Sequence, residues 1–527
     1  MILNKVVKVV CCMKNKNMYI IINENNVKVK EGIKYENDDF CIVVNTPLYD
    51  NNHKKLKLNN VLMMYLQNIE LANVVSNTFS VVIIDKKNQQ VTCIQDLNGD
   101  SIPIYYFKHN KQLVFTNKIV NIINLYSNIS FDMNEKSVKR FMKKGFIANQ
   151  ETLLSNIFKV LPKYNVTVYL DNKKKDKFCK KKIRYSKLKG INTEKYISEF
   201  KKILENYEKN KNVFTTLSNG YDSNFIFRFL NKNKTIEAFS IGGIAGRDEA
   251  SLVEKNIQDY RGVHLNKAYV DEKTLENYPD LIYHLEGALY EQGIFLQYEL
   301  SNTIHQKGNK NMILFSGEGS DQVFSWSYHS KFIDFLKQFR YFLSVVKHFF
   351  ENDELSNLRI PGGFLNITSY YHSLTYVILK KNGILMNDIN ISYVHPYLMR
   401  PIIDIAYANR HLNLNDKKSH IKACEREIDP KIMKNIMNVG GTTEPIALFK
   451  NCSYLGRIEN LVRNSKYNIL KVSKERSFNE YLDYLLKVLY LEIFEYIFVK
   501  RSLTEENIKN TKLSDILDKL YLKKMYV

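Results

Sequence analysis

The amino-acid sequence predicts an α/β protein with two domains, and three observations lead to this prediction. The chain has 527 residues, which is longer than one typical domain. Residues 1 to about 180 contain short β-branched and aromatic runs separated by Asn, Asp and Lys, a pattern typical of strands. From residue 193 helical and strand patterns alternate, which indicates a parallel sheet with helical crossovers. We therefore expect one domain over residues 1–185 and a second over residues 190–527.

In the first part, the clearest strand patterns lie at residues 18–22 and 79–84, which are rich in Ile, Val, Tyr and Phe. The Lys-rich stretch 171–189 contains few apolar residues. Such a composition favours a domain boundary or an exposed turn region.

In the second part, a predicted helix leads to a buried strand, a turn and another helix. Further strands are predicted downstream, and after residue 317 the chain is expected to be mainly helical. The predicted helices are 194–210, 224–230, 331–350 and 401–409, and the predicted strands are 212–217, 235–241 and 312–315.

Composition and charge exclude several classes of protein. Hydrophobic residues make up 45% and charged residues 25%, which are values of ordinary globular chains. The net charge of +22 arises mostly from Lys spread along the chain, so we expect no nucleic-acid partner. The seven cysteines are scattered without a CxxC pair, which favours reduced thiols in a cytoplasm.

No membrane span is expected from the apolar runs. The best candidate, residues 481–499, contains Asp483, Lys487, Glu492 and Glu495 and is predicted to be an amphipathic packed helix. The N-terminal residues do not have the pattern of a signal peptide. His284, Glu286 and Glu291 do not match the spacing of metal ligands and are expected to lie on a helix lining a cleft or exposed to solvent.

The strongest local signal is segment 217–223, Leu-Ser-Asn-Gly-Tyr-Asp-Ser, between a predicted strand and a predicted helix. Small residues let backbone N–H groups surround an anion, and the helix N-terminus adds positive potential. Ser218 and Ser223 can donate hydroxyl hydrogen bonds to phosphate, and Asp222 suits a Mg²⁺ that bridges pyrophosphate oxygens. The missing Walker A lysine disfavours a kinase. A tight Asn-Gly turn between two elements is the alternative interpretation.

A second segment favours phosphate binding. The predicted strand 312–315 runs directly into residues 316–321, Ser-Gly-Glu-Gly-Ser-Asp, which form another glycine turn with carboxylates. In a parallel sheet, ligands collect at the carboxyl ends of the strands. We therefore expect Asp222 and Asp321 to meet across one metal ion.

These two segments resemble motifs of the asparagine synthetase superfamily. Residues 218–223 are similar to its S-G-G-x-D-S pyrophosphate loop, and residues 316–321 are similar to its S-G-[DE]-G-[GS]-D motif. The resemblance extends in chain order over about residues 70–445, through 96–106, 161–162, 242–249, 262–264, 395–401, Lys422 with Arg426, and 430–441.

The resemblance implies a fold and an activity. The fold is an N-terminal Ntn-hydrolase-like β-sandwich, a degenerate glutaminase-like domain, followed by an ATP-pyrophosphatase (PP-loop) α/β domain with helical additions. The activity is that of an ATP- and Mg²⁺-dependent carbon–nitrogen ligase. In such a ligase a carboxylate attacks the α-phosphorus of ATP, pyrophosphate leaves, and an amine then displaces AMP from the acyl-adenylate.

The resemblance also implies roles for individual residues. Glu318 would take the proton of the attacking amine, although a further metal or turn contact suits it equally well. Lys422 would contact phosphates, although by itself it looks like a solvated surface lysine. The remaining roles are a pyrophosphate cradle of Ser218, Gly220 and Ser223, a further cofactor-binding position at Gly317, a Mg²⁺ site of Asp222 and Asp321, and an adenine contact of Leu217 and Ile241.

Departures from the family pattern point to a subtype. Glutamine-using members begin, after removal of Met, with a nucleophilic Cys, whereas position 2 here is Ile, and Cys11 and Cys12 are expected to be buried thiols. We therefore expect no glutamine hydrolysis, so the amine is free ammonia or part of the substrate. This is typical of branches resembling β-lactam synthetase and lasso-peptide cyclases, and residues 321–401 look closer to the cyclases.

Two further departures bear on catalysis itself. Asn219 stands where the family has Gly, and Asn tolerates left-handed backbone geometry better than most residues. Residues 436–439, Ile-Met-Asn-Val, stand where the family has an Arg and a Lys. Lys434 in the preceding turn is a candidate to replace that Lys, but nothing in the sequence establishes this role.

The leading hypothesis is therefore an ATP-dependent ligase that closes an amide within a peptide or an amino-acid-derived substrate. A precursor peptide and a peptidase are the expected partners. The alternatives are an ammonia-dependent amidotransferase resembling asparagine synthetase, and a nucleotide-binding paralogue without turnover.

Overall fold

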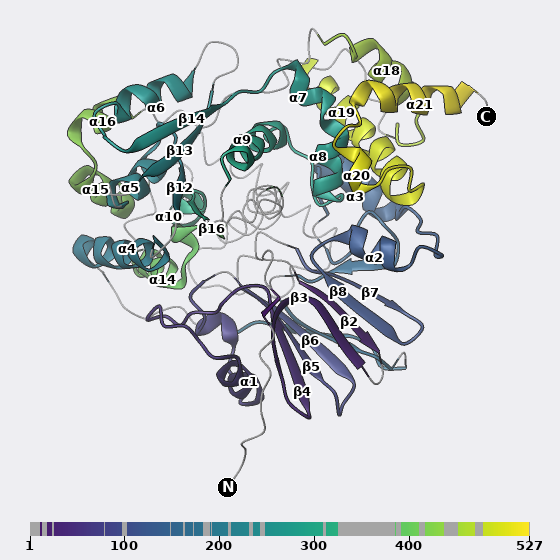
Figure 1. Cartoon of the computed structure of the whole chain (residues 1–527), viewed down its shortest axis with the longest axis horizontal. Helices are drawn as coiled ribbons and strands as arrows, with labels where there is room; N and C mark the ends of the chain where they lie inside the picture. The colour runs from purple at the N-terminus through teal and green to yellow at the C-terminus, as the bar shows by residue number, and fades with distance from the viewer. Residues whose placement is uncertain are drawn as a thin grey trace, which may run out of the picture.

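The computed structural model describes residues 11–12, 18–23, 26–77, 79–96, 103–147, 149–161, 164–171, 173–182, 190, 192–208, 212–230, 235–242, 248–308, 312–324, 385, 392–409, 417–436, 452–469 and 478–525. Strands in these ranges form two separate sheets, one early in the chain and one later, with helices around both (Figure 1). Of the helices described, none has the length and apolar run needed to cross a bilayer.

The first sheet is antiparallel throughout and, in the described residues, contains eleven strands. Its strand order is β11-β10-β6-β5-β4-β3-β2-β8-β7-β9, with β1 paired to β3. The strands are β1 (Cys11–Cys12), β2 (Tyr19–Asn23), β3 (Asn26–Glu36), β4 (Phe40–Val44), β5 (Ser80–Asp85), β6 (Gln90–Gln95), β7 (Tyr105–His109), β8 (Gln112–Thr116), β9 (Ile157–Lys159), β10 (Tyr164–Tyr169) and β11 (Lys177–Lys180).

This sheet curls back on itself. Lys108 on β7 donates a hydrogen bond to the backbone carbonyl of Tyr169 on β10, although these strands lie near opposite ends of the strand order. Alternate residues such as Ile20, Val82 and Val166 pack together in one buried cluster on a single face of the sheet. A β-sandwich consists of two packed layers of strands. In this domain both layers belong to one sheet that curls back on itself.

The Lys-rich stretch 171–189 is not only an exposed turn, as its composition suggested. Lys177–Lys180 form β11, an edge strand, and an edge strand tolerates charged side chains because only one of its sides is paired. The next residue, Lys181, is buried, and its ammonium donates to the backbone carbonyls of Gln95 and Asp96.

The second sheet is parallel, with strand order β14-β13-β12-β15-β16 in the described residues. Its strands are β12 (Asn212–Thr216), β13 (Ile236–Ile241), β14 (Val263–Ala268), β15 (Met312–Phe315) and β16 (Ser392–Val394). The predictions for β12, β13 and β15 are confirmed, whereas β16 lies in a region predicted to be mainly helical. The chain runs from β12 to β13 and β14 on one side and returns with β15 on the other, so the order reverses between β12 and β15.

The helices and helical turns with described bounds are α1 (Leu58–Leu66), η1 (Leu71–Asn73), α2 (Ile119–Leu125), α3 (Glu135–Lys144), α4 (Thr193–Glu208), α5 (Tyr221–Phe229), α6 (Glu249–Ile257), α7 (Glu272–Glu276), α8 (Tyr278–Leu285), α9 (Ile294–Gln306), α10 (Ser320–Phe324), η3 (Pro396–Leu398), α14 (Arg400–Ala408), α15 (Lys418–Glu427), α16 (Pro430–Asn435), α18 (Leu455–Arg463), α19 (Phe478–Phe494), η4 (Glu495–Val499), α20 (Glu505–Ile508) and α21 (Leu513–Met525). The predicted helices at 194–210 and 401–409 correspond to α4 and α14. The helix α5 begins three residues earlier than predicted, directly after its N-cap Gly220. The predicted helix 331–350 lies outside the described residues.

Helices cover both faces of the parallel sheet. On one face, Val213 and Ile313 share a buried cluster with residues of α4, α5, α14 and α15. On the opposite face, Phe214 and Leu314 pack with residues of α9. Because successive residues of each strand point to opposite faces, both sides of the sheet are apolar, as a doubly covered parallel sheet requires.

A third region of core packs helices of the second part of the chain against the antiparallel sheet. The candidate membrane segment 481–499 lies in α19 and the π-helical turn η4, and most of its side chains are buried in a cluster with residues of α3, α8, α18 and α21. Figure 1 shows α19 among these helices near the C-terminus. Its charged residues are paired within the protein; Lys487 Nζ lies 2.8 Å from Asp483 Oδ2. The prediction of a packed helix is confirmed, whereas the amphipathic part of it is not, because no residue of 481–499 is exposed.

Glu286 fastens the second part of the chain to the first. It follows α8, its side chain is buried, and its carboxylate accepts hydrogen bonds from the backbone N–H groups of Ile119 at 2.7 Å and Val120 at 3.0 Å. These N–H groups begin α2 and have no partner within the helix. The expectation that Glu286 lies in a substrate cleft or in solvent is therefore wrong, because sequence spacing alone does not reveal a partner 167 residues away.

We expect Glu286→Ala to lower the free energy of unfolding by about 3 kcal/mol, because two buried N–H groups lose a charged acceptor. Denaturant unfolding followed by circular dichroism measures the change. The control is Glu205→Ala at an exposed position on α4, where a change within about 0.5 kcal/mol is expected. Equal effects of the two variants would contradict the junction role of Glu286.

Candidate functional site

Two loops meet at the carboxyl-terminal edge of the parallel sheet. Thr215 of β12 lies opposite Phe315 of β15 in parallel register, so the segments that follow these strands leave the sheet side by side. Gly317 makes the close approach possible. A Cβ added at this glycine would lie 3.0 Å from the backbone N of Ser223 and 3.2 Å from Cβ of Asp222. The second loop therefore packs directly on the first turn of α5.

The first loop is shaped by its own hydroxyl groups. The Oγ atoms of Ser218 and Ser223 lie 2.9 Å apart, and the N–H of Ser218 donates to Ser223 Oγ at 3.0 Å. The N–H of Gly220 donates to Ser218 Oγ at 3.2 Å, and α5 begins immediately afterwards. Two hydroxyls and a helix N-terminus are thus gathered at one point, an arrangement suited to an anion.

Asp222 and Asp321 converge on a single cation, the ammonium of Lys417. The Nζ atom lies 2.9 Å from Asp222 Oδ2 and also forms an ion pair with Asp321 Oδ1. The side chain of Lys417 is 16% exposed, whereas that of Asp321 is 52% exposed. The expected meeting of the two aspartates is therefore present, with an ammonium between them.

Neighbouring side chains fix the orientation of the Asp222 carboxylate. Its Oδ1 accepts hydrogen bonds from Ser320 Oγ at 2.8 Å and lies 2.9 Å from His420 Nε2. The other ring nitrogen of His420 lies 2.9 Å from the hydroxyl of Tyr196. The backbone carbonyl of Asp222 accepts a further bond from the hydroxyl of Tyr397 at 2.8 Å.

Charge and burial set the ionisation of this cluster. Burial would raise the pKa of Asp222, but Lys417 and His420 outweigh it and hold that pKa below the usual range. Burial would lower the pKa of Lys417, but the two carboxylates raise it above the usual value. Burial lowers the pKa of His420 despite the opposing effect of Asp222. A neutral His420 then donates from Nε2 to Asp222 and accepts at Nδ1 from Tyr196.

The remaining predicted residues lie around this cluster. Leu217 is buried, Ile241 is half-buried, and both stand at the carboxyl ends of neighbouring strands. Glu318 is half-buried in the second loop, where its N–H donates to Ser316 Oγ at 3.3 Å. Lys422 is exposed on α15 and forms no ion pair with a residue that the structure describes.

Sequence reasoning missed Lys417 and His420. The signal was at the start of α15: His420 and Cys424 are four positions apart and share one helical face, whereas 422 lies on another, and Lys417 is the N-cap that precedes the helix. His420 and Cys424 are buried on that face, with Cys424 Sγ 3.5 Å from His420 Nε2. In the structure it is Lys417 whose ammonium pairs with both aspartates.

Asn219 was also underestimated. Its buried side chain donates to the backbone carbonyl of Asn435 at 2.7 Å and accepts from Nδ2 of Asn256 at 2.9 Å. Nδ2 of Asn435 donates to Oδ1 of Asn256 at 3.1 Å, which closes a triangle of three asparagines. The N–H of Asn219 donates to Oε1 of Glu249 at 2.9 Å. The first loop is thereby tied to α6 and to the end of α16. Residues 437–441, where the family Lys is missing, lie outside the described residues.

The carboxylates of Asp222 and Asp321 suit Mg²⁺ better than a metal ion that is held by protein ligands alone. In the described ranges, no group of three or more His, Cys, Asp or Glu side chains is arranged to hold a metal ion. Mg²⁺ is usually bound by one or two carboxylates together with waters and substrate phosphates. Asp222 and Asp321 supply these carboxylates, and the ammonium of Lys417 already occupies the position of a cation between them.

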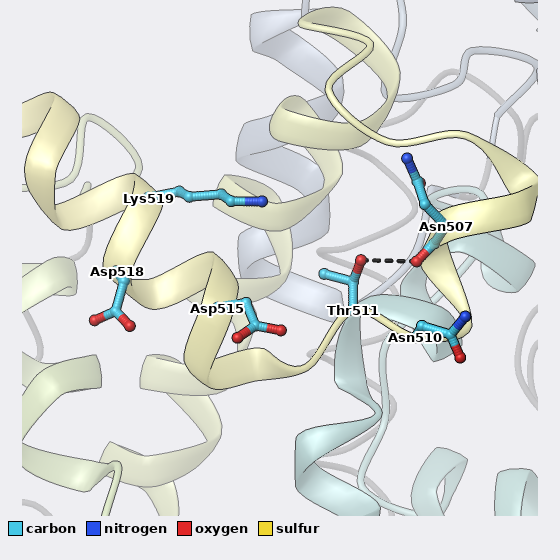
Figure 2. Close-up of a pocket in the computed structure, with 6 residues that line it drawn as sticks. All are labelled: Asn507, Asn510, Thr511, Asp515, Asp518 and Lys519. Carbon is cyan, nitrogen blue, oxygen red and sulfur yellow. Dashed lines mark hydrogen bonds between the residues drawn. The ribbon is translucent and has the colours of Figure 1, made fainter.

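Two surface hollows lie elsewhere. Figure 2 shows one of about 440 Å³ on α20 and α21, lined by Asn507, Asn510, Thr511, Asp515, Asp518 and Lys519. Thr511 Oγ1 donates to the backbone carbonyl of Asn507, so part of the lining is bonded locally. The second hollow, of about 400 Å³, lies where α3 meets η4, around Glu135, Lys466 and Glu495. Neither hollow contains a residue of the two loops.

Comparison with known proteins gives two family matches. A model described as glutamine amidotransferase domain matches residues 34–181, which include most of the curled sheet. A model described as asparagine synthase matches residues 205–361, which include both loops. No curated protein matches the chain.

Twenty-six chains of solved structures also match. One is titled as the structure of the allosteric regulatory enzyme of purine biosynthesis; it is 9% identical over 48% of this chain and 74% of its own, with a TM-score of 0.20. Another is titled as glutamine phosphoribosylpyrophosphate amidotransferase from B. subtilis complexed with ADP and GMP; it is 9% identical over 57% of this chain and 75% of its own, with a TM-score of 0.19.

The two family models match in the order in which their domains occur in the superfamily, and the second covers the two loops on which the sequence resemblance depends. The chain belongs to the asparagine synthetase superfamily.

Proposed function

We propose that this protein is an ATP-dependent ligase that activates a carboxylate as its acyl-adenylate and joins it to an amine, releasing AMP and pyrophosphate. The observation that supports it best is the convergence of Asp222 and Asp321 on one cation at the edge of the parallel sheet. Bound between these carboxylates, Mg²⁺ would neutralise the negative charge that develops on the departing pyrophosphate. The domain boundary that we propose between residues 185 and 190 separates this ligase unit from the curled sheet.

The chain's own residues then take distinct parts. The hydroxyls of Ser218 and Ser223 and the N–H of Gly220 exchange their mutual bonds for the pyrophosphate oxygens, supported by the N-terminus of α5. His420 and Ser320 hold the Asp222 carboxylate in one orientation, so no reorientation is needed when the ligand binds.

At the other end of the nucleotide, Leu217 and Ile241 flank the adenine. Glu318 accepts the proton that the attacking amine loses as it displaces AMP. Its half-buried position in the second loop supports a carboxylate that acts as a base.

The substrate we favour is a peptide or an amino-acid derivative that contains both the carboxylate and the amine, so that the reaction closes a ring. An internal amine needs no separate supply of ammonia. Free ammonia with aspartate and a nucleotide-binding scaffold without turnover are the two other outcomes that experiment has to separate.

Exchange of labelled pyrophosphate into ATP, measured with a panel of free and peptide carboxylates, tests adenylation directly. We expect Asp222→Asn and Asp321→Asn each to reduce the Mg²⁺-dependent exchange by about a hundredfold or more, because neither amide replaces the charge of a metal-binding carboxylate. Asp259→Asn, at an exposed position after α6, should leave exchange unchanged.

Pyrophosphate exchange that is retained in Asp222→Asn would show that Asp222 does not bind the metal ion. If no acid supports exchange while ATP still binds, the scaffold interpretation holds. AMP release that requires ammonium and aspartate would instead favour simple amidation.

Asn219 provides a separate test of the first loop. Restoring the glycine of the family with Asn219→Gly removes the side-chain bonds to Asn256 and Asn435, so we expect the protein to lose about 1–2 kcal/mol of stability. The amides of α16 should then exchange with deuterium faster, as measured by mass spectrometry. Asn510→Ala, on the distant hollow of Figure 2, is the control. Unchanged exchange in α16 would show that the triangle does not hold this helix to the loop.

A further inference from the structure

The ammonium of Lys417 lies where a divalent cation would have to bind. Its Nζ is 2.9 Å from Asp222 Oδ2 and 3.2 Å from Asp222 Oδ1, and it pairs with Asp321 Oδ1 as well. An ammonium and a metal ion held by the same two carboxylates would repel each other at close range in a largely buried site. Binding of one therefore opposes binding of the other.

The side chain of Lys417 is able to leave. It is long and unbranched, its backbone lies at the N-cap of α15, and a shift of its ammonium disturbs no backbone hydrogen bond of the helix. The residue has a φ of 51°, in the left-handed region that disfavours side chains larger than glycine.

We propose that Lys417 is an exchangeable internal cation: it occupies the two-aspartate site until a metal–triphosphate complex arrives, and its ammonium then pairs with phosphate oxygens of that complex. This inference rests on the proposed function and adds an order of binding, in which metal ion and nucleotide enter together. It also assigns to Lys417 the positive charge that residues 436–439 lack.

Binding of Mn²⁺, used as a paramagnetic substitute for Mg²⁺ and followed by electron paramagnetic resonance on the full chain, tests the exchange. Without nucleotide, we expect Lys417→Met and Lys417→Gln to bind Mn²⁺ about tenfold more tightly than the wild type, because the competing ammonium is gone. Lys417→Arg keeps the positive charge, so its affinity for Mn²⁺ should remain as weak as that of the wild type. Lys418→Met, an exposed neighbour on α15, should match the wild type.

With a non-hydrolysable ATP analogue present, we expect the wild type, and no longer the Lys417 variants, to bind the metal–nucleotide complex more tightly. The wild type should bind Mn²⁺ tightly, whereas Lys417→Met should bind the analogue about tenfold more weakly, because a phosphate-pairing cation is missing. Equal Mn²⁺ affinity of the wild type with and without the analogue would overturn the exchange, and this measurement needs no variant.

The failure of this inference differs from a failure of the proposed function. If Mn²⁺ and the analogue bind in a manner that depends on Asp222 but the Lys417 variants behave as the wild type, only the exchange is wrong. If the wild type binds no Mn²⁺–analogue complex at all, the ligase proposal fails as well.

Discussion

Thr215 on β12 and Phe315 on β15 are opposite each other in parallel register, and this pairing places two loops distant in sequence at one edge of the sheet. The meeting of the two aspartates depends on it. Asp222 and Asp321, which are 99 positions apart, reach the same ammonium only because their loops leave neighbouring strands in the same direction. Gly317 keeps the loops in contact, because any side chain at this position would meet the backbone of Ser223. The site lies where the strand order reverses, the usual position for a ligand in an open α/β sheet.

The electrostatic design of the site follows from burial. A carboxylate as enclosed as that of Asp222 is stable only if its charge is balanced and its oxygens accept hydrogen bonds. Lys417 balances the charge, and Ser320 and His420 supply the hydrogen bonds. Because His420 is neutral, it orients the carboxylate without adding a second positive charge. The cation at the site is therefore contributed by Lys417 alone among these contacts, and it can be exchanged without loss of the bonds that orient Asp222.

The sequence was most informative where the chemistry is local. Segments 217–223 and 316–321 carry their small residues and carboxylates within a few positions, so the loops and their place after buried strands were predictable. Partners that are distant in sequence were not. Lys417 was overlooked in favour of Lys422, since the choice depends on which face of α15 meets α5. Glu286 was placed in a cleft because its partner, the start of α2, is far away in the chain. The edge strand β11 was hidden by its lysines, which are compatible with pairing on one side only.

The charges of the site also explain how an internal lysine is compatible with the metal site that we propose. Two carboxylates against one ammonium leave a single negative charge when no ligand is bound. A divalent cation that binds alone brings no acceptor for the displaced ammonium, which loses both of its carboxylate partners. A metal ion that arrives with a triphosphate brings acceptor oxygens for the displaced ammonium, so the same exchange becomes favourable. An arrangement of this kind discriminates against free metal ions and selects the nucleotide complex, and it does so with one lysine and the two aspartates that the register of β12 and β15 brings together.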